Sequence, residues 1–188
     1  MSPAFISGVE ANCPGAHITF DRFHIIKVLG DAVDQVRREE AKTRPELAKS
    51  RYVWLKNRDK LPASQQERLT ALTMSRLNLK TARAWQLKTT FQDLFQQAPG
   101  QAEAFLKRWY FWATHCRLEP MKQAAATVKR HWDGILRWFT SRISNGILEG
   151  TNSLIQAARS RARGYRSTKN LIAMIYLLGA GLSFALPT

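Results

Sequence analysis

Apolar residues recur every three or four positions along most of this 188-residue chain, a spacing that predicts helices. The clearest case runs from Arg22 to about Ala41, where the apolar positions form one face of a long helix: Phe23, Ile26, Leu29, Val33 and Val36. The one convincing strand is Ala16 to Phe20, which follows a Cys-Pro-Gly turn and stops at Asp21. We therefore expect a mainly α chain with little β.

The rest of the chain divides into further predicted helices. A short helix is expected from Pro3 to Glu10, and a helical array from Pro45 to Ala98. Pro99-Gly100 ends that array, and more helices follow from Gln101 to about Cys116 and from Pro120 onward. The tryptophans on these helices recur at a spacing that favours core or groove packing, with base-stacking platforms as the alternative. The length favours one domain that carries an insertion.

The charge balance narrows the class of partner. Lys and Arg number 29 against 14 Asp and Glu, which gives a net charge of +15, while the hydrophobic fraction of 45% is ordinary for a folded protein. These values argue against a disordered basic tail and favour a polyanionic partner such as nucleic acid. A basic surface kept only for solubility is the alternative.

Cysteine use and hydropathy indicate the compartment. Cys13 and Cys116 are isolated, and His115 beside Cys116 lacks zinc-ligand spacing, so a reducing cytoplasm fits. The first fifteen residues have neither the basic nor the apolar region of a signal peptide. Leu171 to Leu186 is uncharged, but its sixteen residues fall short of the roughly 20 that span a bilayer. We expect a buried helix with an apolar tail there.

A polar stripe near the C-terminus carries the most chemistry. Its members follow one another at steps of three or four and share a helix face: Asn145, Glu149, Asn152, Gln156, Arg159 and Arg163. Glu149 is a single carboxylate among amides and arginines, which suits a Mg²⁺ ligand beside phosphate. Gly146 and Gly150 favour a close approach by a ligand or another backbone. Alternatively, Asn145 is an N-cap and Glu149 only complements the helix dipole.

A wholly basic segment follows this stripe. Glu149 is the last acidic residue, and all later charges are positive: Arg159, Arg161, Arg163, Arg166 and Lys169. The planar arginine fork suits phosphate, so we expect contact with a DNA or RNA backbone. A merely solvated face is the alternative.

Asp21-Arg22-Phe23-His24 is a second candidate site. The Asp and the His, three residues apart, face the same side of a first helical turn, where they could hold a metal, a water or a phosphate. The alternative is an Asp N-cap with a surface His.

Five ordered landmarks resemble the bacterial insertion-sequence transposases of the ISL3 type, which belong to the DDE superfamily with a ribonuclease-H-like core. The landmarks are Met1 to Phe5, Phe20 to His24, Tyr52 to Asn57, Ser144 to Asn152, and Arg161 to Tyr165. The resemblance implies that Glu149 is the third acidic metal ligand and that Asp21 and His24 form the Asp-x-x-His signature that follows the second catalytic Asp. It also implies that Asn145, Asn152 and the five basic residues contact DNA.

The same resemblance implies a domain layout. Residues 1–42 would be part of the ribonuclease-H-like core, with the strand 16–20 and the following helix. Residues 43–140 would be an all-helical insertion. Residues 141–188 would return to the core with the Glu149 helix, the basic segment and the apolar tail.

One departure from the family bears on activity. In the family an Asp precedes the Met-Ser-Pro stretch, and the first catalytic Asp and the sequence-reading modules lie further upstream, whereas this chain begins at Met1. The chain resembles an N-terminally truncated transposase fragment, which we expect to be inactive by itself. The intact enzyme would use Mg²⁺ or Mn²⁺, whereas this chain should bind no metal tightly.

The expected partner is double-stranded DNA, both element ends and target. The intact enzyme would be a homo-oligomer in the bacterial cytoplasm, associated with the nucleoid and not with membrane. Two other readings stay open, namely a non-enzymatic helical basic DNA-binding protein and, more weakly, a peripheral membrane protein anchored by the apolar tail.

Overall fold

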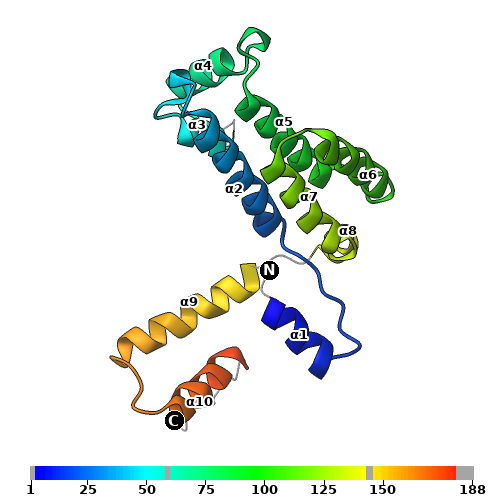
Figure 1. Ribbon diagram of the computed structural model, residues 1–188. Helices are drawn as coiled ribbons and strands as arrows, with labels where there is room; N and C mark the ends of the chain where they lie inside the picture. Colours follow the sequence, from blue (N-terminus) through cyan, green and yellow to red (C-terminus); the bar gives the residue numbers. More distant parts are fainter. Residues whose placement is uncertain (1–2, 58–59, 143–145, 181–188) are drawn as a thin grey trace. The chain divides into compact units, whose positions relative to one another are not determined.

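The computed structural model of the chain describes residues 3–57, 60–142 and 146–180, and in these ranges the regular structure is helical with no strand (Figure 1). The helices are α1 (Pro3–Asn12), α2 (Arg22–Glu40), η1 (Pro45–Leu47), α3 (Arg51–Leu55), α4 (Ala63–Leu72), η3 (Ser75–Leu77), α5 (Lys80–Asp93), η4 (Leu94–Gln96), α6 (Pro99–His115), α7 (Glu119–Arg130), α8 (Trp132–Ser141), α9 (Gly146–Arg161) and α10 (Thr168–Gly179). The prediction of a mainly α chain is confirmed.

The chain separates into two compact units, Met1–Arg142 and Ile143–Thr188. The predicted division at residue 42, between a partial core and a helical insertion, stays a prediction.

The first unit is built around α2. One face of this helix is buried through Ile25, Leu29 and Val33, and it packs against α3, α5 and α7. The facing side of α5 buries Ala84, Leu87 and Phe91, and Figure 1 shows α2 running beside α5. Burying a Leu, Ile or Phe side chain contributes about 1.5–3 kcal/mol, so this helix pair supplies much of the apolar stabilisation of the unit.

The far end of α2 also caps α5. The carboxylate of Glu40 accepts hydrogen bonds from the backbone N–H groups of Lys80 (2.8 Å) and Thr81 (2.7 Å) and from the Thr81 hydroxyl (2.8 Å). These N–H groups lie at the helix start, where no partner exists within the helix. The cap of α5 therefore comes from a residue 40 positions earlier in the chain.

Aromatic side chains join α5 to α6. Trp109 is buried, donates its indole N–H to the Leu87 carbonyl at 2.8 Å, and meets the Phe91 ring edge to face at 4.7 Å. The expected core packing of tryptophans is confirmed for Trp109, but Trp112, three positions on, is 41% exposed. The buried stripe of α6 consists of Ala102, Leu106, Trp109 and Ala113, and Trp112 lies at the edge of that stripe.

The predicted strand at residues 16–20 is wrong. A strand needs a neighbouring strand for its backbone groups, and residues 16–20 instead lie in an irregular segment against α8. The Phe20 N–H donates to the Gly134 carbonyl at 3.1 Å, and the Arg137 guanidinium donates to the Ile18 carbonyl at 3.2 Å. The Phe20 ring also lies 4.4 Å from the His131 ring, and burial lowers the pKa of that histidine.

The second unit pairs α9 with α10. The expectation that the apolar stretch from Leu171 forms a buried helix is wrong for α10, since it contains no buried residue and leaves Ile172, Tyr176 and Leu177 exposed. A single partner helix covers only one stripe of a helix that is apolar on most sides. Residues 181–186 of that stretch lie outside the described residues.

Lys88 is a buried cation within the first unit. Its side chain is 2% exposed, and its Nζ donates to the carbonyls of Trp54 and Leu55, both at 3.0 Å. Burial lowers the pKa of Lys88 to about 8 because it disfavours the charged form.

This lowered pKa predicts how stability changes with pH. Below about pH 8 the folded protein must hold a desolvated ammonium, and that penalty is relieved as the pH rises toward the ordinary lysine value of 10.5. The Lys88 contribution to the free energy of unfolding should therefore rise by up to about 3 kcal/mol between pH 8 and 10.5. Urea unfolding at several pH values should show this rise as the difference between wild type and Lys88→Met. The exposed Lys107→Met variant should keep the wild-type slope, and equal slopes in all three would contradict the prediction.

The contact between Phe20 and α8 predicts a second stability effect. A Cβ placed on Gly134 would lie 2.3 Å from Cδ2 of Phe20. Gly134→Ala should therefore cost about 1–3 kcal/mol in overpacking, offset by up to about 1 kcal/mol of helix propensity.

Thermal or urea unfolding measures this effect, with Gly30→Ala as the matched control. A Cβ on Gly30 would meet its nearest neighbour at an ordinary 3.9 Å, so that variant should be neutral or stabilising. Truncating Phe20 to Ala in the Gly134→Ala background should recover stability. Gly134→Ala as stable as Gly30→Ala would refute the contact.

Candidate nucleic-acid interface

Helix α9 carries the polar stripe on its exposed side. Glu149 in the first turn and Asn152 one turn on are exposed, as are Gln156 and Arg159 further along. The opposite stripe is half-buried at Thr151, Ile155 and Ala158. This division follows from the three-and-four spacing of the two residue sets. Asn145 and the preceding Ser144 lie outside the described residues.

The turn after α9 presents the basic segment. The N–H of Gly164 donates to the Arg159 carbonyl at 2.9 Å, and the N–H of Arg163 donates to the Ser160 carbonyl at 3.1 Å. These two bonds form a Schellman motif, the usual end of a helix. Arg163 occupies its left-handed position with φ 52°, where glycine is favoured, so an arginine side chain is held there against backbone preference.

Helix α10 begins directly after this turn. The Ser167 hydroxyl caps it by accepting from the Asn170 N–H at 3.3 Å. All five predicted DNA-contacting cations, Arg159, Arg161, Arg163, Arg166 and Lys169, are exposed, and they span the end of α9, the turn and the start of α10. A helix start presents N–H groups to anions, so the turn combines exposed cations with backbone dipoles.

Asp21 and His24 lie together at the start of α2. The Asp21 carboxylate caps the helix by accepting from the Phe23 N–H at 2.6 Å, and the His24 N–H donates to the Asp21 carbonyl at 3.2 Å. Asp21 is half-buried and His24 is exposed. The N-cap alternative for Asp21 therefore describes its local geometry. This pair belongs to the first unit and Glu149 to the second.

A Mg²⁺ site would need further ligands beside Glu149. Its carboxylate and the Asn152 amide are the hard oxygen donors that Mg²⁺ prefers, and Mg²⁺ often takes only one or two carboxylates from a protein. Within residues 3–57, 60–142 and 146–180 no three His, Cys, Asp or Glu side chains gather in a metal-binding group. Glu149 therefore fits as one member of a ligand set.

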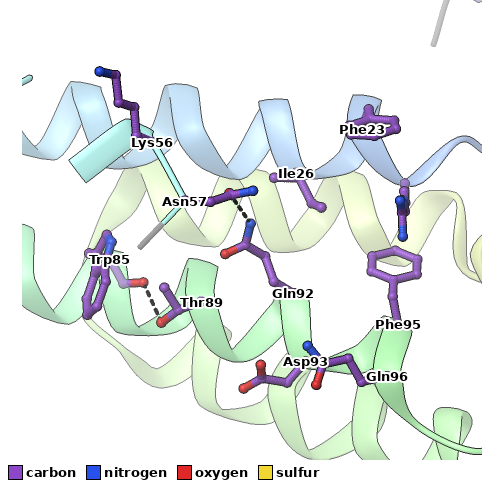
Figure 2. A pocket seen from close by; sticks show the side chains of 11 residues that line it. Phe23, Ile26, Lys56, Asn57, Trp85, Thr89, Gln92, Asp93, Phe95 and Gln96 are labelled. Carbon is purple, nitrogen blue, oxygen red and sulfur yellow. Dashed lines mark hydrogen bonds between the residues drawn. The ribbon is translucent and has the colours of Figure 1, made fainter. Parts of the chain in front are cut away.

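An open groove in the first unit was not anticipated from the sequence. It encloses about 640 Å³ between α2, the residues that follow α3, α5 and η4. Figure 2 shows Asn57 and Gln92 facing each other inside it, joined by a hydrogen bond of 3.1 Å from the Gln92 amide nitrogen to the Asn57 amide oxygen. Phe23, Trp85 and Lys56 also line it. Residues 52–57 formed one of the family landmarks, but no spacing rule connects them to α5.

Among the described residues no helix is both long and apolar enough to cross a bilayer. This finding bears on the apolar stretch only as far as Ala180, where the described part of the chain ends.

The comparisons with known proteins agree on one family. The family profile DDE_Tnp_ISL3, described as Transposase, matches residues 1–175. The transposase for insertion sequence element IS1001 of Bordetella parapertussis is 30% identical over 175 residues, which cover 88% of this chain and 43% of that protein. The transposase for insertion sequence element IS1557 of Mycobacterium tuberculosis is 28% identical over 207 residues, with 95% of this chain and 46% of that protein covered.

The chain thus spans less than half the length of the curated relatives it matches. No solved structure matches it. Since the family profile matches residues 1–175, nearly the whole sequence, this chain belongs to the ISL3 family of transposases.

Proposed function

We propose that the chain is the C-terminal part of the catalytic domain of a DDE transposase. The intact enzyme would cleave DNA at the ends of an insertion sequence and join the freed 3′ hydroxyl to target DNA. The observation that carries this proposal is the exposed Glu149 on a helix that leads directly into five exposed cations with no further acid, in a chain of transposase sequence. A nuclease site needs that combination of carboxylate and phosphate-binding surface.

In this proposal Glu149 holds a metal together with carboxylates from the rest of the longer enzyme. Bound Mg²⁺ or Mn²⁺ would stabilise charge on the reacting phosphate and lower the pKa of a bound water. Asn152, exposed one turn further on the same helix face, would hydrogen-bond a neighbouring phosphate or base edge. Asn145 would do the same at the start of the helix.

The five cations would hold the DNA backbone beside Glu149. Arg159 and Arg163 extend the Glu149 face toward the end of α9, and Arg161, Arg166 and Lys169 add charge around the turn. Phosphate contacts fix the register of a protein on DNA without reading its sequence. They would place a scissile phosphate at the carboxylate.

Asp21 and His24 would contribute from the start of α2. The resemblance to the family implies that Asp21 and His24 form its Asp-x-x-His signature. The capping bond to Phe23 holds the Asp21 carboxylate in one orientation. We propose that the His24 imidazole, exposed on the same turn, contacts substrate and that Asp21 fixes the turn that presents it.

The fold and assembly of the intact enzyme are part of the same proposal. Residues 1–42 and 141–188 would complete a ribonuclease-H-like core, with residues 43–140 as a helical insertion that packs back on α2. A homo-oligomer would bring two element ends together, and a double-stranded DNA substrate would keep the enzyme with the nucleoid.

Replacing Arg163 by Gly separates DNA binding from folding. Glycine suits the left-handed backbone at this position, so stability should rise by up to about 1 kcal/mol. Loss of a phosphate contact should at the same time weaken duplex binding and lower the salt slope of log Kd by about one. Fluorescence anisotropy at several salt concentrations measures the slope, and urea unfolding measures the stability.

Arg117→Gly is the matched control, because Arg117 is also exposed and left-handed, with φ 57°, after α6. It should gain similar stability and keep the wild-type salt slope. Equal salt slopes of log Kd for the two variants would show that Arg163 does not contact DNA.

The role of Glu149 is tested by complementation. We expect no Mg²⁺- or Mn²⁺-dependent nicking by this chain alone, and nicking at element ends once it is joined to the N-terminal part of a full-length ISL3 transposase. In that full-length enzyme Glu149→Gln should reduce nicking at least a hundredfold while leaving DNA binding within about twofold, because it removes a ligand and keeps the shape.

Glu119→Gln controls for helix-dipole effects, since Glu119 is likewise an exposed acid in the first turn of a helix, α7. It should nick DNA normally. Full activity of Glu149→Gln would overturn the metal-ligand role, and DNA binding without nicking in every full-length form would favour the non-enzymatic basic DNA-binding protein.

A further inference from the structure

We propose that the groove of the first unit holds one unpaired nucleotide of the DNA substrate. This inference rests on the proposed function, because it assumes that the chain acts on DNA. The groove is lined by residues other than Glu149, the basic turn after α9 and the Asp21–His24 pair.

Aromatic rings supply the first part of such a site. Phe23 lines the groove with 64% of its surface exposed, which is unusual for a phenylalanine on a helix whose other face is core. Trp85 is half-buried and meets Trp54 edge to face at 6.3 Å, so the tryptophan is fixed by the core while it lines the groove. Nucleobases stack on rings of this kind regardless of sequence.

Amide groups supply the second part. The bond between Gln92 and Asn57 uses one donor of the first and one lone pair of the second. Among the described residues this leaves the Asn57 N–H₂ and the Gln92 carbonyl oxygen able to bond a ligand, one as donor and the other as acceptor. A base edge carries donors and acceptors side by side and matches such a pair.

Charge around the groove is arranged for a nucleotide as well. The Arg22 guanidinium lies 5.1 Å over the Phe23 ring, and Lys56 Nζ lies 6.0 Å from the Tyr52 ring, so each cation is held beside an aromatic surface. Both line the groove and would hold a backbone phosphate. Asp93 also lines it, and its carboxylate would repel phosphate but accept from the exocyclic amine of a base.

Size and position favour a single unpaired nucleotide over intact duplex. A volume of about 640 Å³ is in the range of small-molecule sites, roughly 300–1,000 Å³. A paired, stacked base cannot offer its face to Phe23, so the base must leave the helix. Arg22 and Phe23 directly follow Asp21, so a strand that reaches the Asp21–His24 turn would also reach the groove.

The experiment compares two DNA probes on the full chain. One is a duplex with a single unpaired 2-aminopurine, and the other is the same duplex with that base paired. We expect at least tenfold tighter binding of the unpaired probe, equivalent to about 1.4 kcal/mol, and quenching of its fluorescence by stacking. Phe23→Ala should bring the affinity ratio of the two probes close to one and abolish the quenching.

Phe111→Ala is the matched control, because Phe111 is 65% exposed on α6 and does not line the groove. It should keep the wild-type ratio. A wild-type ratio near one, or an equal fall in both variants, would overturn the groove as a nucleotide site while duplex binding through Arg163 stands. Absence of any DNA binding would overturn both this inference and the proposed function.

A second pair of variants tests the phosphate contact. Lys56→Gln should weaken binding of the unpaired probe several-fold more than binding of the paired probe. Lys129→Gln is its control, since Lys129 Nζ also lies over an aromatic ring, 4.6 Å from that of Trp132. Equal losses on both probes for Lys56→Gln would contradict a role in the groove.

Discussion

The packing of α2 against α5 is the interaction on which the first unit depends. Apolar burial draws the two helices together, and the Glu40 carboxylate fixes their register by capping the start of α5 with three hydrogen bonds. Burial alone is non-directional and would tolerate sliding by a turn. The charged cap is directional, so it selects one register. The bonds from Lys88 to the Trp54 and Leu55 carbonyls hold the end of α3 beside α5, where Asn57 accepts a hydrogen bond from Gln92.

Other polar contacts inside the first unit are also directional and fix how its helices pack. The buried Asp34 carboxylate lies 2.8 Å from the Arg37 guanidinium, with Arg38 and Arg51 within 4 Å. Lys88 joins α5 to the two last carbonyls of α3. Each of these contacts requires the desolvation of polar groups, but it is directional and fixes the position of the helices. Apolar helix surfaces alone would allow several arrangements.

The sequence predicted the parts of the structure that depend on local pattern. Helices and their apolar faces follow from spacing, and α2 begins and ends within one residue of its expected bounds. The prediction of a strand at 16–20 was wrong because backbone groups of this segment bond to α8 and not to another strand, a contact that no local rule contains. The expected burial of α10 failed because apolar composition says which surface needs cover but not whether a neighbour supplies it.

The candidate sites also differ in whether they follow from a local sequence pattern or from tertiary packing. The exposed stripe of Glu149, Asn152 and Arg159 on α9 was predictable, since one helix carries it. The groove was not, because its residues come from α2, the segment after α3, α5 and η4 and meet only through tertiary packing. Tyr52 to Asn57 was recognisable as a landmark, but its partner Gln92 carries no sequence signal.

The contact of residues 18–20 with α8 has a consequence for the order of folding. Ile18 and Arg137 are separated by 119 residues in the sequence. The hydrogen bond between them therefore closes a loop that contains all the helices from α2 to α7. Loop entropy delays such contacts until the intervening chain is compact. The docking of residues 18–20 on α8 should therefore follow formation of the helices between them, whereas the Asp21 cap of α2 joins residues two positions apart and needs no such closure.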